Sequence, residues 1–320
     1  MTTPGYNTGG QNISGQFGMP LYGIQGSPLP FTGNYFWVDE TNGSDGNTGG
    51  PTDPFATLTQ ALAKCTANNN DVVFMSGSVH VTASVAWSKA KTHLIGLSPP
   101  SQNSRARIAI ANTAATSGAV SPLVNVTASG CWFQNIEAFN GINQAATQVA
   151  WANAASENYY KNCNFIQTGN ATAAAQAGSR ALTVGAGDEN LFEGCTIGGD
   201  TLVRATNANA TMEFLGGSAR NVFRNCVFQS WVTDASDVQV LVNAGGMDRY
   251  ALFEQCTFHN FGTAMTVAIT NTSGGGPNGN IILNNSIVIG ATAIASSGQV
   301  YVNQVSAAGA TTTYIGLLAT

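Results

Sequence analysis

A short phrase that returns at a nearly constant interval constrains this chain more than any other feature. It reads NYYKNCNF at 158–165, NLFEGCTI at 190–197, NVFRNCVF at 221–228, ALFEQCTF at 251–258 and NIILNNSI at 280–287. The cysteine position of the repeat is held by Ile136, Cys163, Cys195, Cys226, Cys256 and Ser286, so the successive steps are 27, 32, 31, 30 and 30 residues. A repeat of about 30 residues predicts a solenoid, in which each coil packs on its two neighbours.

The apolar residues of the phrase predict two short strands joined by a sharp bend. Three positions before the cysteine position stand Phe133, Tyr160, Phe192, Phe223, Phe253 and Leu283, and two positions after it stand Ala138, Phe165, Ile197, Phe228, Phe258 and Val288. A straight strand alternates its faces with period 2, so an odd offset cannot keep both sets on one face. The residue just before the cysteine position is Asn135, Asn162, Gly194, Asn225, Gln255 or Asn285. Asn and Gly tolerate the left-handed conformation that such a bend requires.

Stacked coils place equivalent residues about 4.8 Å apart. We therefore predict a core that contains Phe165, Phe192, Phe223, Phe228, Phe253 and Phe258. The cysteines then serve as small interior residues with free thiols, and the stacked Asn side chains bond to one another along the bend.

The position two residues before the cysteine should face outward. It reads Gln134, Lys161, Glu193, Arg224, Glu254 and Asn284. Charges that alternate in sign predict a ladder of surface pairs across neighbouring coils. Catalysis by Glu193 and Glu254 is the alternative interpretation.

Segments between the phrases supply further strands at 181–184, 211–215, 238–242, 265–269 and 299–303, and earlier coils at 93–97, 107–110 and 123–126. Asp53 and Pro54 predict the start of a helix over 54–67 that caps the open end of the solenoid. Its buried face would hold Phe55, Leu58, Leu62 and Cys65. Asp39, Asp45 and Asp53 lack the spacing of an EF-hand, so we interpret them as loop-capping acids rather than calcium ligands.

Residues 1–33 are rich in Gly, Pro, Gln and Asn and carry only isolated apolar residues, among them Phe17, Leu21, Ile24 and Phe31. This segment has no hydrophobic period and cannot form a core by itself. We expect an extended N-terminal arm that lies against another surface.

Composition and motifs exclude several classes of function. The net charge is −5 with 11 scattered Lys and Arg residues, which argues against nucleic-acid binding. No apolar run approaches the about 18 residues of a membrane span, and the first residues do not resemble a signal peptide. We find no nucleophile motif, phosphate-binding loop or dinucleotide fingerprint, and we predict no cofactor, no metal and no catalytic residue. Only 8% of residues are charged, which suits either a surface partly covered by neighbouring subunits or a stable, poorly charged extracellular protein.

One group combines an aromatic ring with charges on the loops after two adjacent coils: Asp200, Arg204, Trp231, Asp234 and Asp237. A tryptophan beside acids is typical of a carbohydrate site, and Trp and Arg are also enriched at subunit interfaces. Because the chain has only 16 acidic residues and three scattered histidines, we interpret the group as a glycan or subunit contact without catalysis.

The phrases, together with VDETNGSDGN (38–47), DPFATLTQAL (53–62), NDVVFM (70–75) and HLIGL (93–97), resemble right-handed parallel β-helix proteins over about residues 35–310. Pectate-lyase-like enzymes and bacteriophage virion proteins share this layout. The run from Ala61 to Pro100 is most similar to head-associated phage structural proteins.

The resemblance implies an all-β fold, a right-handed single-stranded parallel β-helix with a short capping helix and an extended N-terminal arm. It divides the chain into an attachment arm (1–33), a cap with the first coils (34–90) and the β-helix proper (91–320). It also implies a non-enzymatic virion protein, a head decoration or cement protein assembled in the host cytoplasm as a homotrimer. Phe17, Leu21, Ile24 and Phe31 would bind the major capsid protein or other virion subunits. The alternative is a tail spike or fibre that binds or cleaves host glycans.

Overall fold

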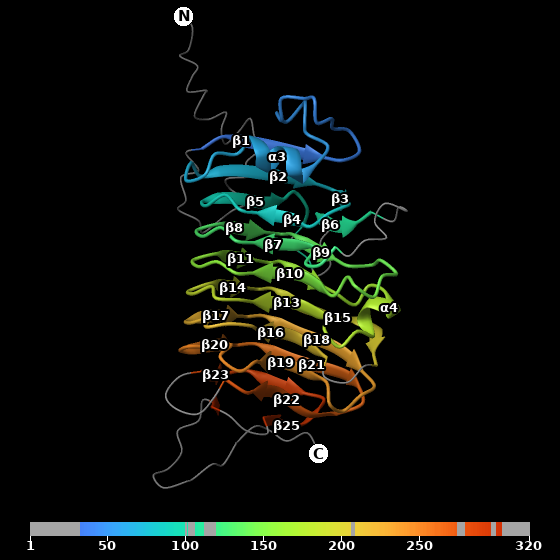
Figure 1. Cartoon of the computed structure of the whole chain (residues 1–320), viewed down its shortest axis with the longest axis vertical. Coiled ribbons are helices and arrows are strands. Elements are labelled where there is room, and N and C mark those ends of the chain that lie inside the picture. Colours follow the sequence, from blue (N-terminus) through green and yellow to red (C-terminus); the bar gives the residue numbers. More distant parts are fainter. Residues whose placement is uncertain are drawn as a thin grey trace, which may run out of the picture.

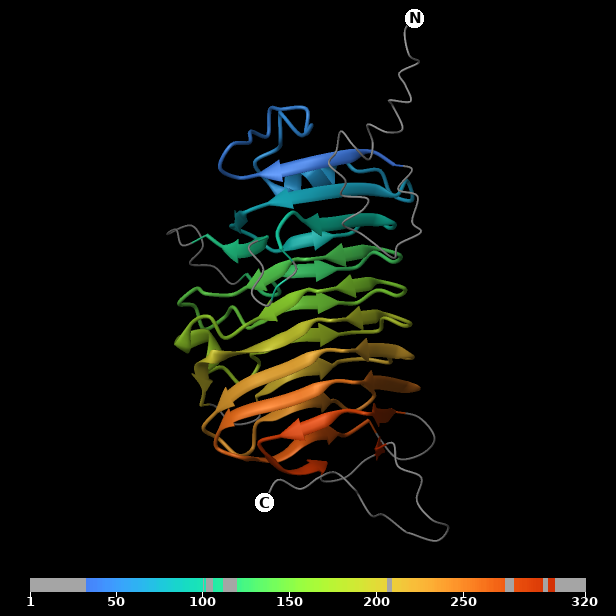
Figure 2. The same ribbon diagram turned by 180° about the vertical axis from the view of Figure 1, so that it is seen from behind.

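Each repeat of the sequence forms one coil of the chain, and each coil pairs in parallel with the coils before and after it. The computed structural model describes residues 33–99, 101, 106–111, 120–205, 209–273, 279–295 and 299–302. The strands of these residues form three parallel sheets stacked along one axis (Figures 1 and 2). This confirms the predicted fold, a parallel β-helix of the right-handed, pectate-lyase-like type with very little helix.

The three sheets are named here in the order in which each coil visits them. Sheet 1 contains β1 (Tyr35–Asp39), β2 (Asp71–Ser76), β5 (Thr92–Gly96), β8 (Trp132–Gln134), β11 (Tyr159–Lys161), β14 (Leu191–Glu193), β17 (Asn221–Arg224), β20 (Tyr250–Glu254), β23 (Asn280–Asn284) and β26 (Val300–Val302). Sheet 2 contains β3 (Ser78–Val81), β6 (Arg107–Ile110), β9 (Glu137–Phe139), β12 (Asn164–Ile166), β15 (Thr196–Arg204), β18 (Val227–Val232), β21 (Thr257–Gly262) and β24 (Ile287–Ile289). Sheet 3 contains β4 (Val85–Trp87), β7 (Val124–Val126), β10 (Val149–Asn153), β13 (Arg180–Val184), β16 (Ala210–Phe214), β19 (Val238–Val242), β22 (Met265–Asn271) and β25 (Ala291–Ala295).

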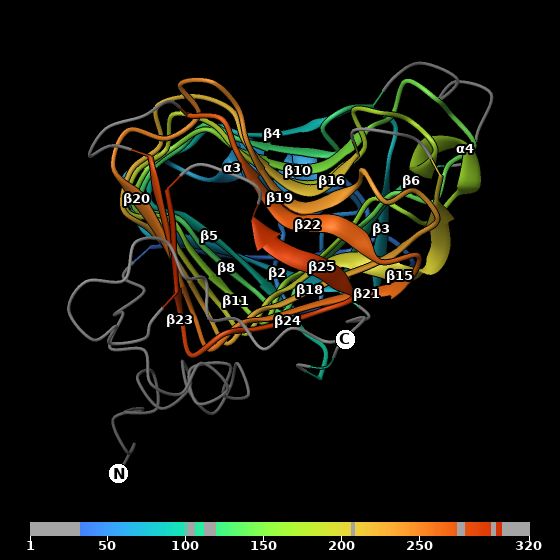
Figure 3. The ribbon, with the colours of Figure 1, turned by 90° about the horizontal axis from the view of Figure 1, so that it is seen from below.

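Viewed along the axis, the three sheets enclose one continuous interior (Figure 3). The predicted one-residue bend joins sheet 1 to sheet 2 in every repeat. Its φ angles are positive: 54° at Asn135, 51° at Asn162, 63° at Gly194, 53° at Asn225, 54° at Gln255 and 49° at Asn285. Because the bend reverses the alternation once, the large residues before and after it both point inward, as the odd spacing predicted.

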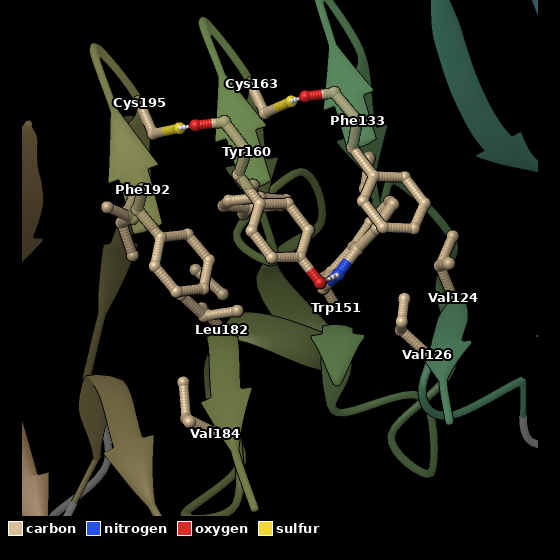
Figure 4. Packing of buried hydrophobic residues seen from close by; sticks show 14 of the residues in the cluster. Val124, Val126, Phe133, Trp151, Tyr160, Cys163, Leu182, Val184, Phe192 and Cys195 are labelled. Atoms are coloured by element: carbon tan, nitrogen blue, oxygen red, sulfur yellow. Dashed lines mark hydrogen bonds between the residues drawn. The ribbon is translucent and has the colours of Figure 1, made fainter. Parts of the chain in front are cut away.

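Aromatic rings stack along the interior in the predicted register. Phe192 pairs with Phe223 and Phe223 with Phe253, with ring centroids 4.5 Å and 4.8 Å apart. The six predicted core phenylalanines are fully buried. Tyr160 continues the stack, and its hydroxyl meets the Trp151 indole of sheet 3 (Figure 4). These contacts join sheets 1 and 3 through one aromatic column.

All six cysteines are buried free thiols, as predicted. In four consecutive coils the Sγ atom points at a backbone carbonyl of the preceding coil, for example Cys226 Sγ at 3.3 Å from the Phe192 oxygen and Cys256 Sγ at 3.3 Å from the Phe223 oxygen. A thiol is a weak donor, so these contacts satisfy the small polar group at the inner corner. Figure 4 shows the same contacts for Cys163 and Cys195.

The hydrogen-bonded asparagine ladder forms elsewhere than predicted. The bend residues Asn225 and Gln255 are exposed. A buried ladder instead precedes sheet 1, where the Asn158 backbone N–H donates to Asn190 Oδ1 at 2.9 Å and Asn190 Nδ2 donates to Asn221 Oδ1 at 2.9 Å. Amide side chains suit this turn because each can donate and accept along the stack.

Two other local predictions are wrong. The capping helix α3 spans Leu58–Lys64 with Thr57 as its N-cap, since the Asp53 carboxylate bonds instead to Thr48. The predicted face of Phe55, Leu58, Leu62 and Cys65 is nevertheless buried in the core, together with Ala61. The segment 299–303, predicted as the third strand of its coil, contributes β26 to sheet 1. A second, very short helix, α4 (Ala171–Ala174), lies beside β15.

Candidate functional site

The five residues predicted as a glycan or subunit contact lie around the junction of sheets 2 and 3. Trp231 lies in β18, Asp200 and Arg204 lie in β15, and Asp234 and Asp237 lie in the turn from β18 to β19. The structure brings them to neighbouring coils, but in two different environments. Trp231 is 39% exposed, whereas Arg204 and Asp237 are 2% and 1% exposed.

The exposed part is a surface that we call the outer face, formed by the outward residues of β18, β21 and β24. These residues are Val227, Gln229, Trp231, Thr257, His259, Phe261, Ile287 and Ile289. None of them is acidic or carries a Lys or Arg charge. Five of them are large apolar side chains that remain at least one-third exposed: Val227, Trp231, Phe261, Ile287 and Ile289. A cluster of this kind is typical of a binding surface.

Trp231 and Phe261 form the aromatic centre of the outer face. They are register partners in the parallel pair β18–β21, and each side chain is 39% exposed. The His259 ring lies 3.9 Å from the Phe261 ring between centroids. Gly262 has a φ of +105°, and a Cβ atom there would lie 2.8 Å from Trp231 Cδ1. The indole therefore rests on the backbone of the next coil, which fixes its position.

A bulge in β15 flanks this aromatic pair on the preceding coil. Gly199 pairs with Ser230 and Arg204 pairs with Val232, so the residues from Asp200 to Val203 project opposite Trp231. Asp200 is partly exposed at the start of this bulge. Bulges re-aim side chains and are common beside functional sites. The bulge thus brings Asp200 to the coil next to Trp231.

Asp234 follows β18 and is also partly exposed. Its Oδ1 atom accepts hydrogen bonds from the Ser236 backbone N–H at 2.9 Å and from Ser236 Oγ at 2.7 Å. These bonds lower the pKa of Asp234 below its ordinary value. The turn therefore presents an ionised carboxylate.

Arg204 is buried beneath this turn in a polar cluster. Its guanidinium donates to the backbone oxygens of Ser179 and Ala210 at 2.6 Å and to Thr211 Oγ1 at 3.1 Å. Burial lowers the Arg204 pKa to about 10 despite the nearby Asp237 carboxylate. Burial likewise raises the pKa of Asp237 to about 6, and Arg204 opposes that shift. Both side chains are buried, so these two residues belong to the corner itself and are not exposed to a ligand or a subunit.

A second buried ion pair extends the cluster to the neighbouring coils. Arg180 Nε lies 2.6 Å from Glu213 Oε2, and the side chains are 6% and 11% exposed. Arg180 also donates to the backbone oxygens of Ala177 and Ser179, and Asn243 donates to Glu213. Both charges of this second pair thus have partners, as buried charges require.

Sequence reasoning missed Phe261, His259, Ile287 and Ile289 on the outer face. They occupy the outward positions two, four and six residues after the bend, which alternation within the strands could have identified. The predicted attachment residues Phe17, Leu21, Ile24 and Phe31 lie outside the described residues.

In the described part of the chain, no three His, Cys, Asp or Glu side chains gather in a way that could hold a metal ion. No helix in the same part is both long and apolar enough to cross a membrane.

Comparison with known proteins extends only to the fold. No protein-family model and no curated protein matches this chain. Among solved structures, the pectate lyase Pel9A is similar with a TM-score of 0.53 at 13% identity, covering 80% of this chain and 63% of its own. The pectin methylesterase PemA from Erwinia chrysanthemi has a TM-score of 0.52 at 14% identity, covering 83% of this chain and 80% of its own. The chain thus spans less than two thirds of the length of Pel9A.

These comparisons overturn one prediction. The sequence predicted a protein without enzymatic activity, but the two similar structures are enzymes that act on pectin or pectate, which are polysaccharides. At 13% and 14% identity, the similarity establishes the fold alone. The prediction that the protein is not an enzyme is therefore corrected, and activity is considered below.

Proposed function

We propose that the protein acts on a polysaccharide that binds across β18 and β21 on the outer face. The observation that carries this proposal is the pairing of Trp231 with Phe261 on adjacent coils, each ring exposed to the same extent. The face of an aromatic ring carries partial negative charge, and it attracts the partly positive C–H groups of a sugar. Two rings one coil apart favour an extended chain that runs along the solenoid.

Polar groups beside the rings suit the hydroxyl groups of such a ligand. His259, which is partly exposed, lies between Phe261 and the bend on β21. Asp200 lies in the bulge opposite Trp231, and Asp234 lies in the turn after β18. Both are partly exposed, and carboxylates are strong acceptors for hydroxyl donors. The combination of an aromatic platform with a few polar groups is typical of small-molecule recognition.

Asp200 and Asp234 are the carboxylates that we propose for acid–base chemistry on the bound glycan. Cleavage of a glycosidic bond, or proton abstraction beside it, uses carboxylates that can reach the substrate. Both residues are partly exposed, whereas Asp237 and Glu213 are enclosed in the buried cluster. In this scheme Arg204 and Asp237 act only by fixing the turn that carries Asp234.

Binding and turnover can be measured separately with purified protein and a panel of acidic and neutral polysaccharides. We expect Trp231→Ala and Phe261→Ala to weaken binding by about ten-fold each, about 1.4 kcal/mol. Leu215→Ala, which removes another exposed apolar side chain away from this face, should bind normally. Asp200→Asn and Asp234→Asn should retain binding and lose release of shorter products. Unchanged binding in both aromatic variants would contradict the proposal.

A second candidate function is supported by the aliphatic part of the outer face. Ile287 and Ile289 are 58% and 41% exposed, and such side chains suit a protein contact better than a sugar. The face could thus join subunits, as the predicted homotrimer would require. Sedimentation of Ile287→Lys against the parent chain tests this, because a subunit contact predicts a smaller species. The phage-particle setting of either function rests on the sequence resemblance alone.

A further inference from the structure

The outward side of sheet 1 carries an apolar row that runs along the axis of the solenoid. The row takes one residue from each of the strands β11, β14, β17, β20 and β23, which follow one another in Figure 1: Tyr159, Leu191, Val222, Leu252 and Ile282. All five are partly exposed, whereas the residue that follows each of them points into the main core. A continuous apolar row on an outward face is typical of a contact surface.

The charged ladder flanks the apolar row on the side of the bend. It consists of Lys161, Glu193, Arg224 and Glu254, each two residues after a member of the row. All four residues are partly exposed. Along the axis, the charges read positive, negative, positive and negative. Reading the ladder in the opposite direction therefore exchanges every sign.

A second pair of charges flanks the apolar row on its other side. Glu189 and Arg220 lie two residues before the row on the two central coils, at turn positions with φ angles of 58° and 55°. Arg220 Nε lies 2.7 Å from Glu189 Oε1, and the side chains are 41% and 50% exposed. With Glu193, one central coil thus carries two acids, and with Arg224 the next coil carries two arginines.

We propose that two copies of the chain associate through this face of sheet 1 in antiparallel orientation, about a twofold axis that runs along the strands between β14 and β17. Such an axis reverses the order of the coils and keeps the position along each strand, so each row faces itself in reverse order. Glu193 then faces the partner's Arg224, and Lys161 faces the partner's Glu254. Both contacts occur twice, as a twofold interface requires. The proposal does not depend on the proposed function.

The other side of the apolar row obeys the same symmetry. Glu189 faces the partner's Arg220, so the two central coils meet with opposite charges on both sides of the row. One coil further out, Glu157 faces a coil that carries the ion pair of Asp248 and Arg249, which adds no net charge. The two apolar rows meet between these charges. An apolar centre with a complementary charged rim is the usual construction of a specific interface.

A parallel arrangement of the two copies fits less well. A twofold axis parallel to the solenoid keeps each coil at the same height and exchanges the two sides of the apolar row. Glu193 would then face the partner's Glu189, and Arg224 would face the partner's Arg220, so like charges would meet on both central coils. An antiparallel axis placed on a strand would set Glu193 or Arg224 against its own copy. Only an axis between β14 and β17 gives every charge of the ladder a charge of opposite sign.

Sedimentation velocity of the full chain over a series of concentrations tests the association. We expect a dimer that weakens as the salt concentration rises. Arg224→Glu sets an acid against the partner's Glu193 and should raise the dimer Kd by about ten-fold or more. Lys64→Glu, an equal change of charge at an exposed position of α3, is the matched control and should leave the Kd unchanged. A parent chain that stays monomeric at every concentration would overturn the proposal.

The double variant Glu193→Lys with Arg224→Glu separates association from folding. Within one chain it places two positive charges before two negative ones, which is less favourable for the fold than alternation. Across the antiparallel axis, every ladder contact again joins opposite charges. We therefore expect its dimer Kd to return to within about three-fold of the parent value. A double variant that is folded by circular dichroism but associates no better than Arg224→Glu would contradict the proposal.

Zero-length cross-linking of the parent chain tests the orientation without any variant. A carbodiimide joins an amine to a carboxylate that it contacts directly. Lys161 and Glu254 are three coils apart in one chain, about 14 Å, so they can be joined only between two copies. We expect mass spectrometry of the cross-linked dimer to identify Lys161 joined to the partner's Glu254. A dimer in which Lys161 is joined instead to the partner's Glu157 would show the parallel arrangement and overturn the proposal.

Discussion

Arg224 and Glu254, which face each other on neighbouring coils, form an ion pair with 2.7 Å between Nε and Oε2. Glu193 on the preceding coil accepts a hydrogen bond from Tyr159. The predicted ladder therefore exists in register, from Lys161 through Glu193 and Arg224 to Glu254. Arg224 is 42% exposed, so each pair contributes little to stability.

Glu193→Lys should destabilise the fold by about 1 kcal/mol, because it places three positive charges on successive coils and removes the acceptor of Tyr159. Denaturant unfolding at low and high salt measures the effect, and high salt should reduce it. Glu193→Gln, which removes the charge alone, is the control and should cost less. A loss of several kcal/mol, unaffected by salt, would show that the ladder is not a surface feature.

Phe223→Ala should destabilise the fold by about 3–5 kcal/mol, since it opens a cavity in the middle of the aromatic column. The Phe223 ring stacks on Phe192 and Phe253 and contacts Phe228. Phe223→Leu keeps most of the volume and should cost clearly less. Chemical denaturation of both variants tests this, and equal losses would mean that the stacking register is unimportant.

The repeat predicted the fold because one local pattern fixes three properties of a coil. In NVFRNCVF, Phe223 and Phe228 define the inward positions, Asn225 marks the bend and Arg224 marks the outer ladder. No long-range information is needed when equivalent residues stack on one another. The pattern does not identify strands that lack bulky residues. It therefore predicts no strand at Ala291–Ala295 and places the third strand of that coil at 299–303.

The candidate site was only partly predictable for a related reason. Trp231 and Asp237 are six residues apart, but Trp231 faces outward from a strand and Asp237 is buried within the turn that follows. Arg204, whose charge acts on Asp237, belongs to another coil. Phe261 is 30 residues from Trp231 and becomes its neighbour only through parallel pairing. Such contacts depend on register, which the sequence indicated for the core phrases but not beyond them.

Asp237 should make the stability of the protein depend on pH between about 4 and 6. Its pKa is raised from 3.8 to about 6 in the folded state, so the folded chain binds this proton first as the pH falls. The free energy of unfolding therefore gains a contribution below the unfolded pKa that is lost as the pH rises through about 6. Its full size is on the order of 2–3 kcal/mol.

Asp237→Asn should remove this dependence. The difference in unfolding free energy between parent and variant, taken at each pH from 4 to 8, cancels the contributions of other groups such as His93. We expect that difference to change across the window by at least about 1 kcal/mol. A constant difference at every pH would show that Asp237 titrates normally.

Gly262→Ala should weaken polysaccharide binding by disturbing Trp231. The added Cβ atom would lie 2.8 Å from Trp231 Cδ1 and 2.5 Å from the Val232 oxygen, and the φ of +105° is unfavourable for alanine. We expect a stability loss of about 1–3 kcal/mol together with a drop in affinity similar to that of Trp231→Ala.

Gly290→Ala is the matched control, because that residue has a φ of +80° and equally little space but contacts Asn260 rather than Trp231. It should lose comparable stability and retain binding, as measured by titration calorimetry on the same polysaccharide. Parallel loss of affinity in both variants would indicate that backbone strain, and not the position of the indole, controls binding. Retained affinity in Gly262→Ala would show that the ligand does not rest on Trp231.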